Sequence, residues 1–74
     1  MSTFGVVLVH TTSAAMRSER VLLQAGLSVK LVPTPRQFSS ECGIAVRFAW
    51  EQVELVKTLL AAARVGVSSI RPLE

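Results

Sequence analysis

Ile44-Ala45-Val46-Arg47-Phe48-Ala49-Trp50 is the clearest period-two pattern in this sequence, with a large apolar side chain at every second position. Such alternation is typical of a β-strand that places one face against a hydrophobic core. Working outward, Phe4 to Val9 is a continuous apolar run, which predicts a strand buried on both faces and therefore central in a sheet. Ser28 to Val32 and Val67 to Arg71 predict two shorter strands. Pro33 and Pro35 are expected to end the first of them, and Pro72 the second.

Two helices are predicted between these strands. The first spans Ala14 to Ala25, after the candidate N-caps Thr11, Thr12 and Ser13, and Gly26 stands where a C′ glycine stops a helix. Its predicted buried face carries Ala15, Ser18, Leu22 and Ala25, and Val21 and Leu23 are expected to widen it. The second helix spans Glu51 to Val65, with Glu51 and Glu54 in its first turn and Gly66 as its expected C′ residue.

The predicted order of elements is therefore βαββαβ, the ferredoxin-like arrangement of the α+β class. Right-handed crossovers place both helices on one face of a four-stranded antiparallel sheet. The usual strand order for this fold is four, one, three, two, so the first and third strands are antiparallel neighbours. A chain of 74 residues is expected to form one such domain, residues 1–74.

Composition narrows the classes of function. The net charge of +3 comes from Lys and Arg residues that are scattered along the chain, which gives no support to nucleic-acid binding. A single cysteine excludes an internal disulfide and a CxxC metal site, so we expect no metal and no cofactor. The sequence predicts neither a signal peptide nor a membrane span, and a cytoplasmic protein is expected.

The segment from Pro33 to Gly43, PTPRQFSSECG, concentrates the unusual chemistry of the chain. Two prolines restrict its backbone at the start, and a glycine frees it at the end. Between them lie the guanidinium of Arg36, the hydroxyls of Thr34, Ser39 and Ser40, and the thiol of Cys42. Because loops carry function more often than cores do, this loop is the candidate site.

The predicted topology brings distant residues toward this loop. The end of the first strand lies beside the start of the third, so His10 and Cys42 are expected to be close, with Thr12 and Ser13 at the helix N-terminus nearby. A helix N-terminus and a neighbouring cation such as Arg36 lower the pKa of a thiol. The loop hydroxyls and the amides around Gly43 can bind an anion. The alternative is that Cys42 is a buried small hydrophobic residue and that His10 simply faces water.

The residues Pro33-Thr34-Pro35-Arg36, followed by Ser39-Ser40-Glu41-Cys42-Gly43, resemble a family of small uncharacterised bacterial proteins described as putative selenium/sulfur carrier protein-like. Thr12, Ala15 and Glu19 match the earlier part of that pattern, whereas Ser13 stands where the family often has a His. The resemblance implies a carrier in which Cys42 holds sulfur or selenium for a donor and an acceptor protein.

Three functions compete at this point. The first is the carrier, with a persulfide or perselenide on Cys42, rather than a stand-alone enzyme. The second is an interaction or regulatory module that forms a homodimer through its sheet. The third is anion binding at the loop, with the guanidinium of Arg36 donating two parallel hydrogen bonds to the anion. Val7, Val9, Ala45 and Ala49 are candidates for the apolar patch of a homodimer, but the sequence leaves open which side of the first strand faces outward.

Overall fold

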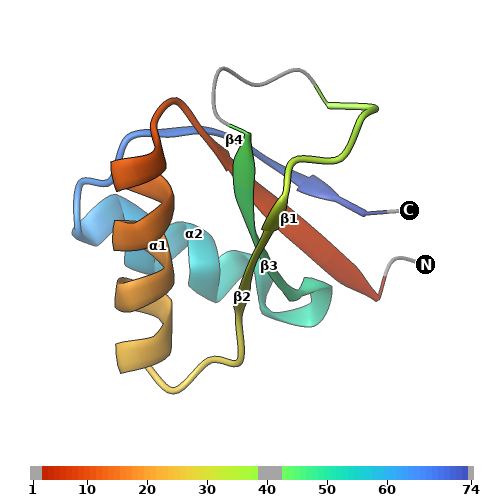
Figure 1. The fold of residues 1–74 in the computed structure, drawn as a ribbon. Helices are drawn as coiled ribbons and strands as arrows, with labels where there is room; N and C mark the ends of the chain where they lie inside the picture. Colours follow the sequence, from red (N-terminus) through yellow and green to blue (C-terminus); the bar gives the residue numbers. More distant parts are fainter. Residues whose placement is uncertain (1–2, 39–42, 74) are drawn as a thin grey trace.

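The computed structural model describes residues 3–38 and 43–73 and contains a four-stranded sheet with two helices on one side (Figure 1). The sheet order is β2-β3-β1-β4, and neighbouring strands are antiparallel. The α+β, ferredoxin-like fold and its strand order are therefore confirmed. The elements are β1 (Phe4–Val9), α1 (Thr12–Gln24), β2 (Lys30–Pro33), β3 (Ile44–Ala49), the 3-10 helix η1 (Trp50–Gln52), α2 (Val53–Ala62) and β4 (Val67–Pro72).

One face of the sheet, which we call the inner face, packs against both helices. Val7 and Phe48, on neighbouring central strands, belong to the same buried cluster as Leu22 of α1 and Leu60 of α2. The predicted buried side of the first helix is confirmed at Ala15, Ser18 and Leu22. It is wrong at Ala25 and Leu23, which are exposed. The Ser18 hydroxyl is fully buried and donates to the Ala14 carbonyl at 2.8 Å, which avoids the cost of an unpaired polar group.

Gly5 allows an aromatic pair to lie against β1 on the inner face. A Cβ at this position would overlap Cε3 of Trp50 and would stand 2.8 Å from Cζ of Phe48, inside van der Waals contact. The two rings stack on each other with centroids 5.9 Å apart. The absence of a side chain at Gly5 thus lets two large apolar groups fill the inner core.

The opposite face, which we call the outer face, has a small apolar cluster of its own. Val6, Leu8 and Ala45 are 0%, 3% and 0% exposed, although no helix residue belongs to their cluster. Partly buried side chains pack against them instead: Val32, Phe38 and Leu73. The structure decides the phase of the first strand that the sequence left open: Val7 and Val9 face the helices and cannot supply an outer apolar patch. Ala45 faces outward but is fully buried.

The first helix begins and ends through local backbone chemistry. The Thr11 hydroxyl accepts from the Ala14 amide at 3.1 Å, so α1 starts two residues before the predicted Ala14. At the other end, the Leu27 amide donates to the Leu22 carbonyl and the Gly26 amide to the Leu23 carbonyl, each at 3.0 Å. These bonds form a Schellman motif with Gly26 at φ +90°, which confirms the predicted C′ glycine.

The second helix is shorter than predicted at both ends. At its start, the Trp50 amide donates to the Thr3 carbonyl at 3.1 Å, and a 3-10 turn precedes α2. At its end, the Val65 amide bonds to the Leu60 carbonyl and Arg64 adopts φ +55°. The C′ residue is therefore Arg64, and the prediction of Gly66 is wrong.

Two prolines lie inside strands rather than after them. Pro33 pairs with Ile44 at the end of β2, and Pro72 pairs with Gly5 at the end of β4. Both strands are at the edges of the sheet, where a missing amide proton is tolerated. Among the described residues, no helix is long and apolar enough to cross a membrane.

Candidate functional site

The loop between β2 and β3 is closed at its base by backbone pairing. After the Pro33–Ile44 pair of the ladder, the Thr34 amide donates to the Gly43 carbonyl at 3.0 Å. The two ends of the loop are therefore held one strand spacing apart, about 4.8 Å. The candidate loop is thus part of a β-hairpin, whose two ends cannot separate without breaking this bond.

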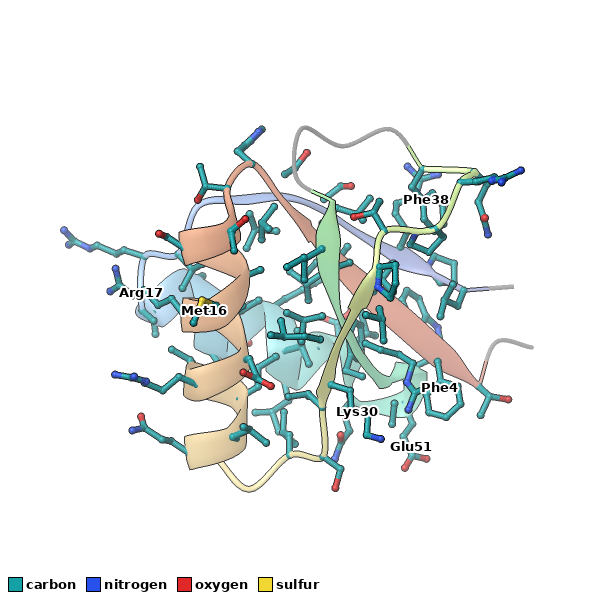
Figure 2. All side chains as sticks on the ribbon, in the orientation of Figure 1. Phe4, Met16, Arg17, Lys30, Phe38 and Glu51 are labelled. Carbon is teal, nitrogen blue, oxygen red and sulfur yellow. The ribbon has the colours of Figure 1, made fainter. Side chains whose placement is uncertain are left out.

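The first half of the loop forms a turn and returns to the outer face. The Phe38 amide donates to the Pro35 carbonyl at 3.1 Å, which leaves Arg36 and Gln37 at the exposed corner. Phe38 packs against the outer apolar cluster, and the guanidinium carbon of Arg71 lies 5.6 Å from the centre of its ring. Figure 2 shows Phe38 on the side of the sheet away from α1.

The end of β1 and the start of α1 lie at the same edge of the sheet as this loop (Figure 1). β1 and β3 pair antiparallel as far as Val7 opposite Val46, so the end of β1, next to His10, runs toward the start of β3, next to Gly43. His10 is exposed, and Thr12 follows as the first residue of α1. Predicted site residues from separate segments therefore converge on one edge.

Two other predicted residues occupy different surroundings. Ser13 is exposed and lines a depression of about 450 Å³ on α1 together with Met16, Arg17 and Arg20. No described residue of the loop lines that depression. Arg36 lies at the exposed corner of the Pro35–Phe38 turn. The depression is thus separate from the described part of the loop, residues 33–38 and 43.

The remaining predicted residues, Ser39, Ser40 and Cys42, lie outside the described residues. The expected closeness of His10 and Cys42 accordingly stays a prediction. Within residues 3–38 and 43–73, no group of three or more His, Cys, Asp or Glu side chains could hold a metal ion.

Two features of the site were missed by sequence reasoning. One is a shallow depression of about 260 Å³ at the loop base, formed by both hairpin strands; its lining residues are Leu31, Val32, Pro33, Gly43 and Ile44. The other is Phe38, which attaches the loop to the outer face. An aromatic side chain within an otherwise polar loop was a signal that could have identified this anchor.

Comparison with known proteins gives one match. The model of a family described as "Putative Se/S carrier protein-like" matches residues 4–72, which include every strand and helix and the whole candidate loop. No curated protein and no solved structure matches the chain.

Proposed function

The chain belongs to the Se/S carrier protein-like family, and from this premise we propose that Cys42 carries a sulfur or selenium atom between two partner proteins. The observation that carries the proposal is the closed hairpin base. Gly43, the covalent neighbour of Cys42, is bonded to Thr34 at the sheet edge where β1 ends and α1 begins. The amides of the first turn of a helix favour negative charge, which a thiolate or a persulfide anion supplies.

The transfer step balances without an external oxidant. The Cys42 thiolate attacks the terminal sulfur of a protein persulfide, a new S–S bond forms on Cys42, and the S–S bond of the donor breaks. The donor cysteine leaves with the electron pair as a thiolate. In the second transfer, a nucleophile of the acceptor attacks the same terminal atom, and Cys42 leaves as a thiolate. A selenium atom at the terminal position of the donor is transferred by the same two displacement steps.

Within this proposal, the other predicted site residues stabilise the anion. Arg36, at the corner of an exposed turn, supplies positive charge, and the first turn of α1 at Thr12 supplies a helix N-terminus. Ser39, Ser40 and Ser13 offer hydroxyls, Gly43 offers its amide, and His10 follows β1 at the same edge. The carrier then needs no catalytic carboxylate, because the reactive bond is already present in the donor.

The test is intact-protein mass spectrometry after incubation with a low-molecular-weight persulfide. The expected result is a mass gain of one sulfur atom that dithiothreitol removes and that Cys42→Ser lacks. The rate of alkylation by iodoacetamide, followed against pH, should give a thiol pKa below its ordinary value near 8.5. Arg36→Gln should raise that pKa while leaving the circular dichroism spectrum unchanged, because Arg36 is exposed. Failure of Cys42 to alkylate at neutral pH would overturn the proposal.

A module that acts only through binding makes the opposite prediction. In that case, Cys42→Ser would retain partner binding and all biological activity. A homodimer through the outer face would have to displace Phe38 and Leu73 from the apolar cluster that they cover. Sedimentation of the wild-type chain and of Phe38→Ala measures whether uncovering this face promotes self-association.

A further inference from the structure

The outer face of the sheet carries three cations in a single row. In the strand pairing, Lys30 lies opposite Arg47, Arg47 opposite Val6, and Val6 opposite Arg71. Directly paired residues place their side chains on the same face of a sheet, and Val6 belongs to the outer cluster. The row Lys30-Arg47-Arg71, which we call the cationic row, therefore crosses the outer face from one edge strand to the other.

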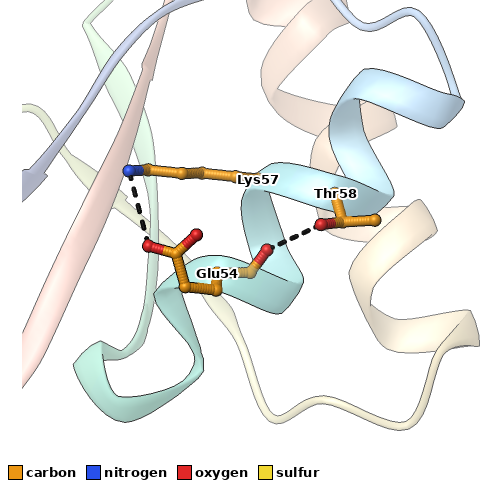
Figure 3. A network of polar contacts seen from close by, with 3 residues as sticks. All are labelled: Glu54, Lys57 and Thr58. Carbon is orange, nitrogen blue, oxygen red and sulfur yellow. Dashed lines mark hydrogen bonds and ion pairs between the residues drawn. The ribbon is translucent and has the colours of Figure 1, made fainter.

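No carboxylate neutralises this row within the described residues. The described glutamates, Glu19, Glu51 and Glu54, lie in α1, η1 and α2 and none lies in a strand. Glu54 is paired with a different cation, because its Oε2 lies 3.8 Å from Nζ of Lys57 (Figure 3). Figure 2 places Glu51 at the same end of the sheet as Phe4 and Lys30, but no described ion pair joins it to the row.

Among residues 3–38 and 43–73, no carboxylate offsets the repulsion between the charges of the row. Like charges directly opposite each other on neighbouring strands, as Lys30 and Arg47 are, repel at a spacing of about 4.8 Å between strands. A partner with negative charge relieves this repulsion when it binds. The row is therefore complementary to an acidic surface.

Both arginines are already oriented by aromatic rings. The guanidinium carbon of Arg47 lies 4.4 Å from the centre of the Phe4 ring, and that of Arg71 lies 5.6 Å from the centre of the Phe38 ring. A guanidinium held on a ring by a cation–π interaction keeps its N–H groups available for a carboxylate. Less side-chain entropy is then lost on binding, which favours affinity.

A depression at one end of the row adds an apolar contact. It has a volume of about 370 Å³, and both Lys30 and Arg47 line it. Its apolar walls come from side chains of β1, β3 and the segment after α1, namely Phe4, Leu27 and Phe48. An apolar residue next to a carboxylate in the partner would fit this end of the row.

We propose that the outer face binds an acidic segment of a partner protein through the cationic row. The identity of that partner as the sulfur or selenium donor or acceptor rests on the proposed function, whereas the binding itself does not require Cys42. Nucleic acid fits this face less well, because binding of single strands uses exposed aromatic rings on which bases stack. Here the centre of the face is aliphatic and covered, and both rings carry a guanidinium.

The experiment uses the full chain with Cys42→Ser, so that its outcome is independent of thiol chemistry. A fluorescent oligoglutamate peptide and an oligouridylate RNA of equal charge are titrated separately, and fluorescence anisotropy gives each Kd. Arg47→Gln with Arg71→Gln should weaken oligoglutamate binding by about tenfold, since charge-assisted hydrogen bonds are lost. The matched control, Arg20→Gln with Lys57→Gln, removes the same charge from the helices and should weaken binding by less than about twofold.

Chemical-shift mapping by NMR locates the peptide and checks the fold of each variant. The expected perturbations fall at amides of residues 4–6, 29–31, 45–48 and 69–72. Because Arg47 is half-buried and its loss can disturb packing on Phe4, the exposed Lys30→Gln serves as an independent variant that should also weaken binding. Equal weakening by the sheet and helix double variants, tighter binding of oligouridylate than of oligoglutamate, or no peptide binding at low salt would each overturn the proposal.

Discussion

The two faces of the sheet are buried by different means. The inner face is covered by two helices, each with its own hydrogen-bonded backbone, whereas the outer face is covered by Phe38 from the hairpin loop and Leu73 after β4. Side chains on both faces are nevertheless fully buried, as Val7 and Val6 illustrate. The candidate loop therefore also serves to pack the sheet. Phe38 both buries the outer cluster and attaches the described part of the loop to the outer face.

The largest expected effect is on the inner face. Phe48→Ala should lower the free energy of unfolding by about 3–5 kcal/mol, because it removes a buried ring that also stacks on Trp50. A domain of this size has a total stability of roughly that magnitude, so the variant is expected to be largely unfolded. Urea denaturation followed by circular dichroism measures this change. A decrease in the free energy of unfolding below about 1 kcal/mol would contradict the view that packing between the helices and the inner face dominates stability.

A matched pair of substitutions compares the two faces directly. Val7→Ala and Val6→Ala remove the same atoms from neighbouring residues of β1, and both valines are 0% exposed. We expect losses of about 2–3 kcal/mol for Val7→Ala and about 1–2 kcal/mol for Val6→Ala, because the cost depends on how well the surroundings collapse. Side chains of a loop and of the segment after β4 adjust more readily than side chains between packed helices. If urea denaturation gives the same decrease in the free energy of unfolding for both variants, the two faces do not differ in how well they relax around a cavity.

The contribution of the loop to the outer face is tested at Phe38. Phe38→Ala should lower the free energy of unfolding by about 1–2 kcal/mol, since a partly buried ring is removed from the outer cluster. Hydrogen exchange should accelerate at the amides of residues 36–38 and remain unchanged in α1 and α2. The control is Gln37→Ala, at the exposed corner of the same turn, which is expected to change stability by less than about 0.5 kcal/mol.

The smallest expected change in stability concerns the C-terminal ends of the two helices that cover the inner face. Both helices end in a Schellman motif, but the left-handed residue is Gly26 after α1 and Arg64 after α2. Arg64→Gly should therefore raise the free energy of unfolding by up to about 1 kcal/mol, while Gly26→Ala should lower it by about the same amount. Thermal unfolding of the two variants measures both signs. Destabilisation by Arg64→Gly would mean that the side chain of Arg64 contributes more than its backbone costs.

Much of the fold was predictable from local patterns. The alternation at residues 44–50 predicted which side of β3 faces the helices, and Gly26 predicted the end of α1. Both signals depend on residues that are neighbours in the sequence. These two signals can therefore be interpreted without knowledge of tertiary contacts.

The errors arose where distant segments decide the outcome. The continuous apolar run of β1 carries no periodicity, so the sequence did not indicate that Val6 faces outward and Val7 inward. The start of α2 is set by the bond from Trp50 to Thr3, and its end by a left-handed Arg64 whose neighbour Ala63 accepts a hydrogen bond from Arg17 at 2.9 Å.

The candidate site was predictable only in part. The convergence of His10 and Gly43 on one edge follows from the order of the strands, which local patterns predicted. The cationic row was not predictable from composition, because Lys30, Arg47 and Arg71 are far apart in sequence and only the register of three strand pairs aligns them.

The bond between Thr34 and Gly43 has a consequence for how a carrier of this shape would deliver its atom. Consecutive Cα atoms are about 3.8 Å apart, so a residue joined directly to Gly43 has a short radius of travel. A long flexible arm can search for an acceptor, but a short tether requires the acceptor to bring its own nucleophile to the sheet edge. Dissociation of the donor protein and binding of the acceptor protein would then limit the rate of transfer.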